Sequence, residues 1–237
     1  MGLNLNLIAG SHEMKIMSLK TSFAVALFVA ALPAHANLVT NGSFEQYTLP
    51  TGNLANGQAH GATLASGQWT ILYGTNVTGW NTSIGCNNPN CGIELRNNVA
   101  GAASDGNIYA ELDTNYNSFA SQLLTTTGAL YHLTFDYSPR MNVAAGSNGI
   151  EVWWNGALAG TYTGSGSTTG NNWASQSLYL VGGNPSTTLE FRAVGSSDSY
   201  GGSLDNVSVT VPEPGTLALL GLGLAGLGLA KRKKANA

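Results

Sequence analysis

The sequence predicts an all-β domain, a jelly-roll β-sandwich of about ten antiparallel strands. Between residues 37 and 211 the apolar residues alternate with polar ones or form short runs, and no segment has the period of a helix. Glycine, asparagine and serine interrupt this pattern about every ten residues, as turns between short strands do. The segments on either side differ from the domain, and we expect a cleaved N-terminal signal peptide and a C-terminal transmembrane helix.

Residues 1–36 have the order of a secretory signal peptide. Two lysines precede the apolar run 23–32, which is followed by Pro-Ala-His-Ala. Positive residues, an apolar stretch and a small-x-small sequence are the features of an export signal, so we predict cleavage after Ala36. Met14 and Met17 are alternative starting residues, because the first thirteen residues lie outside this pattern. A buried N-terminal helix is the alternative interpretation of the segment.

The strands of the domain are predicted from alternation. The pattern is clearest at residues 130–137, where Tyr, Leu, Phe and Tyr occupy every second position, so that one face packs and the other meets water. Asn155-Gly156 predicts a two-residue hairpin turn. The expected strands, in chain order, comprise residues 38–45, 68–73, 93–96, 108–112, 120–124, 130–137, 149–155, 157–162, 174–181, 189–193 and 207–211.

The C-terminal segment, residues 212–237, is unlike the domain before it. Pro212, Glu213 and Pro214 interrupt the chain, and prolines prevent a strand or a helix from continuing across them. An uncharged Gly/Leu-rich run follows at 215–230, and four basic residues come after it. As a helix this run is about 24 Å long, so it spans a bilayer core only with local thinning or snorkelling of its basic end. The basic cluster places that end in the cytoplasm and the domain outside.

This order of motif, apolar run and basic cluster resembles the PEP-CTERM sorting signal of Gram-negative bacteria, here with Val-Pro-Glu-Pro-Gly at 211–215. The resemblance implies export and transient anchoring in the inner membrane. It also implies removal of the tail by an exosortase and delivery to the cell surface or to an extracellular polysaccharide matrix. An ordinary single-span anchor without processing is the alternative.

The domain is strongly acidic. Residues 37–211 contain ten Asp and Glu against three Arg and no Lys, which gives a net charge of −7. A protein that binds nucleic acid needs cations to neutralise the phosphates of the backbone. The composition therefore argues strongly against a nucleic-acid partner.

The two cysteines, Cys86 and Cys91, enclose a short Pro/Asn-rich segment. In the oxidising compartment that a signal peptide implies, such a pair predicts a local disulfide. So short a loop adds less than the ~3 kcal/mol expected of a 15-residue loop. A metal site would need further ligands, and neither His60 nor His132 has a supporting spacing.

The domain also resembles the galactose-binding-like β-sandwiches, a fold shared by many carbohydrate-binding modules. The matching segments are residues 37–45, 105–113, 133–140, 152–156 and 203–209. The resemblance implies a structural calcium where the acid of the first strand, Glu45, meets the acid of the last, Asp205, with backbone carbonyls near Asn41 and Ser43 completing the shell. A hard cation would relieve the repulsion between two such carboxylates. The alternative is that both acids are solvated at strand ends.

Sugar-binding sites combine aromatic faces, which stack on pyranose rings, with amides and charged groups that bond hydroxyls. Trp153 shares the outward face of its strand with polar residues and is the best candidate. Trp173 after the Gly/Ser-rich loop, Tyr116 between two asparagines, and Arg140 just beyond a strand are further candidates. For each of them the alternative is structural, either packing of the aromatic ring or an acidic partner for the arginine.

These observations predict a non-catalytic exported protein of the cell surface or extracellular matrix, with extracellular polysaccharide as its partner. A structural or adhesive matrix protein without a defined ligand is the alternative. Glu111 and Asp113 share a face and, with Asp136 and Glu151, could supply the two carboxyls that a glycoside hydrolase holds about 5 to 9.5 Å apart. No Ser-His-Asp or Cys-His arrangement is evident, and no catalytic residue is predicted.

Overall fold

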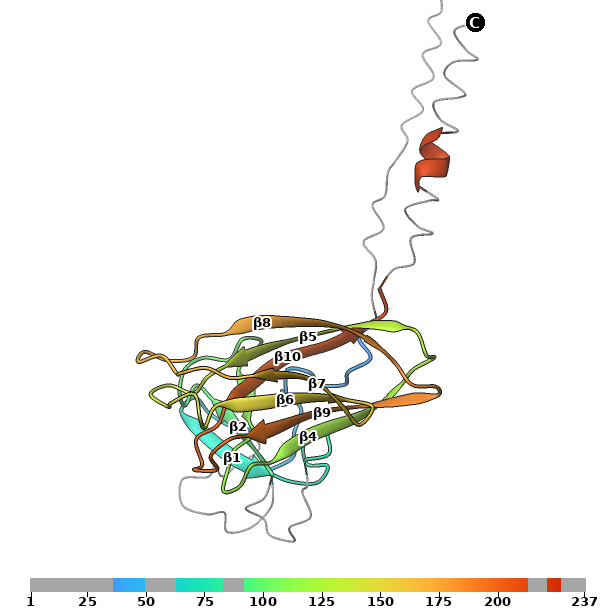
Figure 1. Cartoon of the computed structure of the whole chain (residues 1–237). Helices are drawn as coiled ribbons and strands as arrows, with labels where there is room; N and C mark the ends of the chain where they lie inside the picture. The colour runs from blue at the N-terminus through green and yellow to red at the C-terminus, as the bar shows by residue number, and fades with distance from the viewer. Residues whose placement is uncertain (1–35, 50–62, 83–91, 213–220, 227–237) are drawn as a thin grey trace, which may run out of the picture. The chain divides into compact units, whose positions relative to one another are not determined.

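The computed structural model describes residues 36–49, 63–82, 92–212 and 221–226 (Figure 1). Ten strands in these residues form two antiparallel sheets, which confirms the predicted all-β sandwich. The strands are β1 (Gln68–Leu72), β2 (Ile93–Asn97), β3 (Ile108–Glu111), β4 (Phe119–Thr125), β5 (Leu130–Ser138), β6 (Gly149–Trp154), β7 (Ala157–Tyr162), β8 (Ala174–Val181), β9 (Ser186–Val194) and β10 (Ser203–Thr210).

The two sheets differ in size. The six-stranded sheet has the order β1-β2-β3-β10-β5-β8, and the four-stranded sheet has the order β4-β9-β6-β7. After β3 the chain passes from one sheet to the other at every connection except the hairpin between β6 and β7 (Figure 1). Neighbouring strands in the six-stranded sheet are therefore often far apart in sequence, and this brings distant polar residues together on its outer face.

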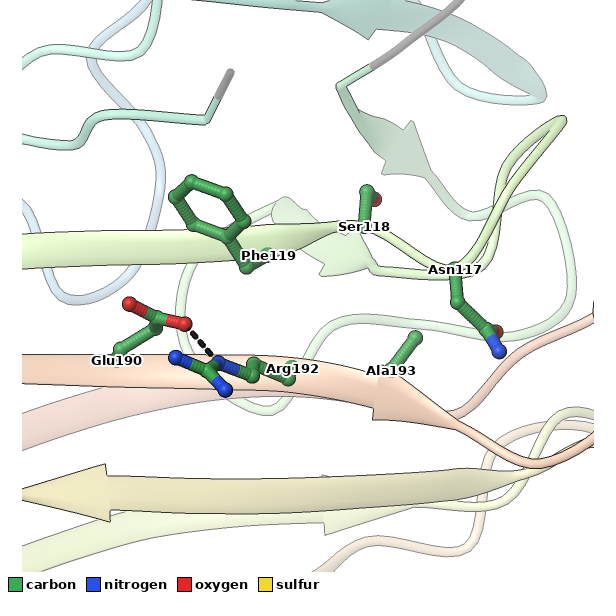
Figure 2. A pocket seen from close by; sticks show the side chains of 6 residues that line it. All are labelled: Asn117, Ser118, Phe119, Glu190, Arg192 and Ala193. Atoms are coloured by element: carbon green, nitrogen blue, oxygen red, sulfur yellow. Dashed lines mark hydrogen bonds and ion pairs between the residues drawn. The ribbon is translucent and has the colours of Figure 1, made fainter. Parts of the chain in front are cut away.

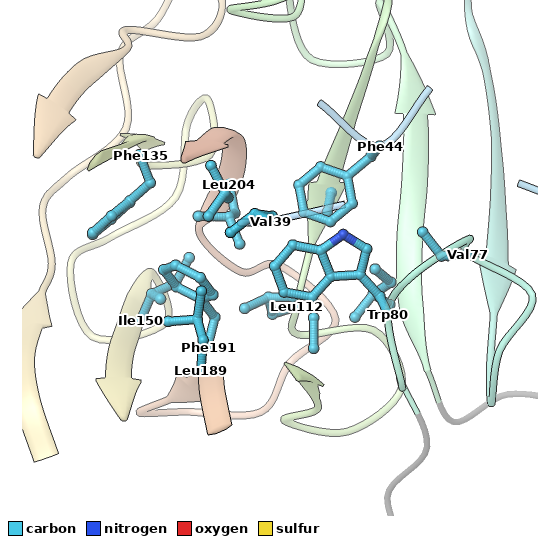
Figure 3. Close-up of a cluster of buried hydrophobic side chains, with 14 of the residues drawn as sticks. Val39, Phe44, Val77, Trp80, Leu112, Phe135, Ile150, Leu189, Phe191 and Leu204 are labelled. Atoms are coloured by element: carbon cyan, nitrogen blue, oxygen red, sulfur yellow. The ribbon is translucent and has the colours of Figure 1, made fainter. Parts of the chain in front are cut away.

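The core lies between the two sheets, and aromatic rings fill much of it (Figure 3). Phe44 stacks on Trp80 with ring centroids 5.3 Å apart, and Phe191 lies edge-on to Phe135 at 5.0 Å. Trp154 is also buried, as the alternation along its strand predicts. Offset and edge-to-face pairs of this kind add to the stabilisation that burial of the rings provides.

The predicted strand at 38–45 is wrong. This segment does bond to β10, since Leu38 N–H donates to Val209 O at 2.8 Å and Val207 N–H donates to Gly42 O at 3.0 Å. Between these contacts the chain turns, with positive φ angles of 55° at Asn41 and 59° at Phe44. Backbone in this region cannot continue a strand. The segment is irregular, although its hydrogen bonds cover β10 beyond the point where β3 ends.

The features predicted for the two ends of the chain and for the cysteines fall largely outside this description. The signal peptide before Ala36, the Cys86–Cys91 pair and most of the tail lie outside the described residues. Residues 221–226 within the tail are helical. Among the residues that the structure describes, no helix is long and apolar enough to cross a membrane.

Candidate functional site

Four side chains of β1, β2 and β3 form a charged and aromatic cluster on the outer face of the six-stranded sheet. The apolar residues Ile93 and Leu95 point into the core, so the alternate residues Glu94 and Arg96 lie on the opposite face. The register places Trp69 opposite Arg96, and Glu94 opposite Glu111. Strand pairing alone therefore brings two acids, one arginine and an indole ring side by side.

Glu111 is the centre of this cluster, and its side chain is fully buried. It contacts the guanidinium of Arg96, and Arg140 Nη1 donates to both its oxygens at 2.8 and 3.2 Å. Gly201 N–H donates to Oε1 at 2.8 Å. Arg96 Nε in turn donates to Glu94 Oε1 at 2.5 Å. Two arginines and two glutamates thus balance in charge, which is what allows them to be buried.

Burial dominates the acid–base chemistry of this cluster. Desolvation raises the pKa of Glu111 to about 7, although the attraction of Arg96 and Arg140 opposes the shift. For Arg96, burial alone would lower the pKa, but the charges of Glu111 and Glu94 raise it. The arginine therefore stays charged at every physiological pH, and the glutamate is the group that can change its protonation state.

A surface hollow of about 250 Å³ opens over this cluster, and we call it the arginine hollow. Tyr200 is 49% exposed at its rim, and the Arg140 guanidinium lies 4.3 Å from the centre of the Tyr200 ring. Trp69, on the same wall, is partly exposed. The residues that line the hollow are Trp69, Ile71, Glu94, Arg96, Val99, Thr114, Asn115, Arg140, Ser199 and Tyr200.

A second buried acid fixes the loop that carries Tyr200. Ser197 Oγ donates to Asp113 Oδ1 at 3.1 Å, and Asp198 N–H donates to Asp113 Oδ2 at 3.0 Å. Burial raises the pKa of Asp113, and the hydrogen bonds from the loop partly offset this. The loop that carries Tyr200 is thus attached at Asp113 and, through Gly201, at Glu111, so the aromatic rim of the hollow is held in place.

A separate hollow of about 340 Å³ lies on the other sheet (Figure 2). It is lined by Asn117, Ser118, Phe119, Glu190, Arg192 and Ala193. Arg192 contacts Glu190, as Figure 2 shows. The buried Oδ1 of Asn117 has no hydrogen-bond partner in the described part of the chain. This second hollow has one aromatic ring and one ion pair, against two rings and three charged side chains in the lining of the arginine hollow.

Trp153, the first sequence candidate, lies near this second hollow. Its ring is covered by Arg192, whose guanidinium is 4.1 Å from the ring centre, and its Nε1 donates to Glu151 Oε2 at 2.9 Å. The prediction that Trp153 faces outward is consistent with its partial exposure. A sugar that stacked on this ring would have to displace Arg192.

The other sequence candidates do not gather in one place. Trp173 Nε1 donates to Ala102 O at 2.9 Å, and its ring meets the edge of Tyr109. Tyr116 is 61% exposed in the loop beside Asn115, which lines the arginine hollow. Arg140 lines that hollow directly, and it also has the acidic partner that the alternative interpretation expected.

Sequence reasoning missed Trp69, Tyr200, Glu94 and Arg96. Alternation with core residues already assigns Glu94 and Arg96 to an outer face. Nothing in the sequence says that β1 and β2 pair with Trp69 opposite Arg96, or that the loop at Tyr200 reaches them. The missing information is the order of strands in the sheet.

The two acids predicted to bind calcium, Glu45 and Asp205, converge on one loop, residues 104–108. Asp205 Oδ2 accepts hydrogen bonds from the backbone N–H groups of Ser104 and Asp105, at 2.7 and 2.9 Å. Glu45 Oε1 accepts from the N–H groups of Asn107 and Ile108, at 2.6 and 2.7 Å. The loop is therefore held from both sides by carboxylates, which are strong acceptors for backbone amides.

Glycine is required at the centre of this loop. Gly106 has a φ angle of +69°, and a Cβ added there would lie 2.3 Å from Glu45 Oε1. Any side chain here would push the carboxylate away, and most residues other than asparagine would also be strained in their backbone. The Asp-Gly sequence at 105–106 thus permits the close approach of Glu45 to the two amides that follow.

The acids at this loop are not both solvated strand ends. Glu45 is exposed, but Asp205 is fully buried and has no ion pair among the described residues. Burial raises the pKa of Asp205 to about 7. Hydrogen bonds from three backbone N–H groups oppose this shift, and the charge of Asp105 adds to it. Three backbone N–H groups, those of Ser104, Asp105 and Asn206, donate to the oxygens of Asp205, so a metal ion would be an additional partner.

Of the backbone carbonyls expected to complete the calcium shell, the one at Asn41 already accepts hydrogen bonds. Asn41 O already accepts from Phe44 N–H and from Trp80 Nε1, at 3.2 and 2.9 Å. No cluster of three metal-ligating side chains is found in the described residues. Glu45 and Asp205 therefore fit a cation by charge and by their common loop, and a shell would need loop carbonyls as well.

The carboxyl groups considered for glycoside hydrolysis have other contacts in the structure. Glu111 and Asp113 are fully buried and hold the arginines and the loop at Tyr200. Asp136 accepts hydrogen bonds from Ser104, Ser175 and Asn206, and although burial opposes it, these bonds lower its pKa. Glu151 accepts from Trp153.

The end of β10 leads directly into the C-terminal motif. The family model described as the PEP-CTERM protein-sorting motif matches residues 210–233, which include Pro212, Glu213 and Pro214. The chain carries a PEP-CTERM sorting motif. The sequence resemblance is confirmed for this segment, and the motif supports export with a C-terminal anchor.

Two curated relatives match the chain in part. The multifunctional-autoprocessing repeats-in-toxin protein of Vibrio vulnificus is 33% identical over an alignment of 119 residues, which covers 45% of this chain and 2% of the toxin. The corresponding protein of Vibrio cholerae is 33% identical over 102 residues, again 2% of its length. The matched segment is thus a very small part of each toxin, and the activity of the toxins does not transfer to this chain.

Several solved structures resemble the domain at low identity. A Stig cyclase from Fischerella sp. TAU is 13% identical, with a TM-score of 0.48, and the match covers 73% of this chain and 96% of the cyclase. A family 35 carbohydrate-binding module from Clostridium thermocellum is 16% identical, with a TM-score of 0.39 and 61% and 99% coverage. A module of family 61, solved with β-1,4-galactotriose, is 13% identical, with a TM-score of 0.40 and 75% and 99% coverage. These neighbours include both enzymes and binding modules, so they do not decide the activity.

Proposed function

We propose that the chain is an exported, exosortase-processed protein of the cell surface or extracellular matrix whose β-sandwich binds a glycan in the arginine hollow. The sorting motif at residues 210–233 supports the export and the processing. The arginine hollow supports the binding. It is the place where exposed aromatic rings and several hydrogen-bonding groups of the described residues come together.

The chemistry of the hollow suits a sugar ring. Tyr200 and Trp69 offer aromatic faces to C–H groups at the rim, and Arg140 supplies N–H donors. Glu94 supplies carboxylate oxygens as acceptors. Because ion pairs and loop contacts fix these groups in advance, a ligand does not have to order them, and this favours affinity.

We propose that the binding is non-catalytic. The support is that Glu94, the acid that lines the hollow, is paired with Arg96, while Glu111 and Asp113 are fully buried and bonded to arginines or backbone amides. A hydrolase needs one carboxyl free to protonate the leaving oxygen and a second that faces the anomeric carbon or its attacking water. Release of reducing sugar from a bound polysaccharide would contradict this proposal.

We also propose a structural calcium at the loop 104–108. Glu45 and Asp205 would hold the ion, with carbonyls of this loop completing its oxygen shell. The ion would supply the positive charge that the buried Asp205 lacks among the described residues. Its role would be to fix the loop, and no step of glycan binding depends on it.

A glycan array with the full chain, followed by titration calorimetry on any hit, tests the binding proposal. We expect Tyr200→Ala to weaken the affinity about tenfold, equivalent to about 1.4 kcal/mol. Trp153→Ala is the matched control, because it also removes a partly exposed ring but lies on the other sheet.

The outcomes are distinct. Loss of binding in the Trp153 variant with an unchanged Tyr200 variant would move the site to the Trp153 surface. A blank array with a cooperatively folded protein would favour a structural or adhesive matrix protein without a defined ligand.

A further inference from the structure

Exposed apolar side chains gather at one end of the six-stranded sheet. Tyr179 is 62% exposed, Val181 66%, Leu130 47% and Val211 43%. Leu130 is paired directly with Val181 across β5 and β8, and His132 with Tyr179, whose rings stack 4.5 Å apart. Large apolar side chains that are this exposed and this close together mark an interaction surface. We call these five residues the terminal patch.

The terminal patch surrounds the point where the domain ends. Thr210, the last residue of β10, is paired with His132 of the patch. The start of β5 and the ends of β8 and β10 therefore lie at the same edge of the sandwich, as Figure 1 shows. Val211 follows at once and is itself exposed.

The tether between this edge and the apolar tail is short. Pro212, Glu213 and Pro214 separate Val211 from the uncharged run that begins at residue 215. The four steps from Val211 to residue 215 span at most about 14 Å. The headgroup layer on each side of a bilayer is about 5 to 8 Å thick. When the tail is in the membrane, the edge with the terminal patch therefore lies within about 14 Å of the hydrocarbon core, at the headgroups or just outside them.

The charge of the terminal patch fits this position. The domain carries a net charge of −7 and would be repelled by anionic lipid. The patch contains no acid, and β8 has no charged residue from Ala174 to Val181. Tyr179 has the amphipathic ring that favours the interface between water and lipid. This edge can thus approach a bilayer without bringing carboxylates of β8 or of the terminal patch to it.

We propose that the terminal patch docks on the outer surface of the lipid bilayer while the tail is anchored, and holds the domain in a fixed orientation until the tail is removed. This inference rests on the anchoring that the sorting motif implies, and it adds a contact between the folded domain and the lipid. Removal of the tail breaks the tether, and the patch alone is too small to retain the domain.

Hydroxyl-radical labelling of the full chain in vesicles of phosphatidylethanolamine and phosphatidylglycerol tests this contact. We expect labelling of Tyr179 and Val181 to fall about threefold or more on anchoring, as burial of apolar side chains in the interface would require. Leu158 and Leu123, which are exposed on the four-stranded sheet, serve as internal controls and should not change. The reference is the Leu222→Lys, Leu224→Lys variant, whose charged tail stays out of the bilayer.

Each outcome decides a different point. Full labelling of Tyr179 in a chain that sediments with the vesicles would overturn the docking proposal and leave the anchoring intact. A chain that does not sediment with vesicles at all would overturn both. If the protection disappears when the ratio of protein to lipid is lowered about tenfold, the terminal patch is covered by a second copy of the chain. That result would also overturn docking on lipid.

Discussion

Replacing Asp205 by asparagine is expected to remove part of the pH dependence of the domain's stability. The folded protein raises the pKa of this carboxyl to about 7, whereas its ordinary value is 3.8. Between these two values the folded state binds more protons at this position than the unfolded state does. Stability must therefore rise as the pH falls from about 8 to about 4, and the charged carboxylate destabilises the fold above pH 7.

The size of the effect follows from the two pKa values. A change from 3.8 to about 7 corresponds to about 4 kcal/mol of unfolding free energy, as an upper bound. For a domain of this length each kcal/mol changes the melting temperature by about 2 to 4 °C. Between pH 5 and pH 8 about 2.6 kcal/mol of this free energy is lost, so the contribution of Asp205 to the change in melting temperature over that range is about 5 to 10 °C. An asparagine side chain does not titrate, so the Asp205→Asn variant should lack this contribution.

Thermal unfolding of both proteins at pH 5 and pH 8, in the presence of a chelator, measures the difference. Groups with shifted pKa values that do not contact Asp205, such as Glu111, titrate in both proteins and cancel in the comparison. If the melting temperature changes equally between pH 5 and pH 8 in the two proteins, the assignment of a raised pKa to Asp205 is refuted.

The same measurement with calcium tests the proposed ion. A cation binds the ionised carboxylate and should nearly cancel the pH dependence of the wild type, because protons and the ion compete for Asp205. At pH 8 and a hundredfold excess over Kd, the ion should stabilise the wild type by about 2.7 kcal/mol. Calcium should stabilise the Asp205→Asn variant much less. Identical melting curves with calcium and with chelator, and no metal in elemental analysis, would remove the site.

Two further predictions concern the charge cluster and the tail. Arg96→Met should cost about 3 to 5 kcal/mol in denaturant unfolding, because it leaves Glu94 and Glu111 with too little positive charge. Arg96→Met combined with Glu111→Leu should lower the unfolding free energy less than Arg96→Met alone. If the double variant is the less stable of the two, the unpaired charge of Glu111 is not the cause of the loss in Arg96→Met. For the sorting motif, the intact mass of the surface form should lack both the signal peptide and the tail. Full-length protein as the steady-state form in the inner membrane would contradict processing.

Alternation was sufficient to predict most of the fold. The strands β7 and β8 have the predicted bounds, and the other observed strands overlap predicted ones. Alternation reports which face of a strand is buried, and that holds whatever the neighbouring strand is. It failed at residues 38–45, where apolar residues do pack but Asn41 and Phe44 adopt positive φ angles. Positive φ at a residue such as Phe44 is set by its tertiary contacts, and no local pattern reveals it.

The candidate site was predictable only in part. Arg140 was identified, and an acidic partner was named as its alternative role. The partner, Glu111, lies 29 residues away in sequence and meets Arg140 because β3 and the end of β5 are both neighbours of β10. Trp153 was expected to be exposed on the outward face of its strand; it is only partly exposed, and its ring is covered by Arg192 from β9. Both facts depend on strand order, which alternation does not contain.

The acidic composition has a structural explanation in this fold. With three arginines for ten acids, most carboxylates of the domain cannot form salt bridges. Several accept hydrogen bonds from backbone N–H groups of Gly-, Asn- and Ser-rich loops instead: Glu45 and Asp205 hold the loop 104–108, and Glu111 and Asp113 hold the loop at Tyr200. Such bonds to charged acceptors are stronger than those between neutral groups. An acid that anchors a loop in this way needs no base, and the domain can be poor in cations and still hold long loops in place at the edges of its sheets.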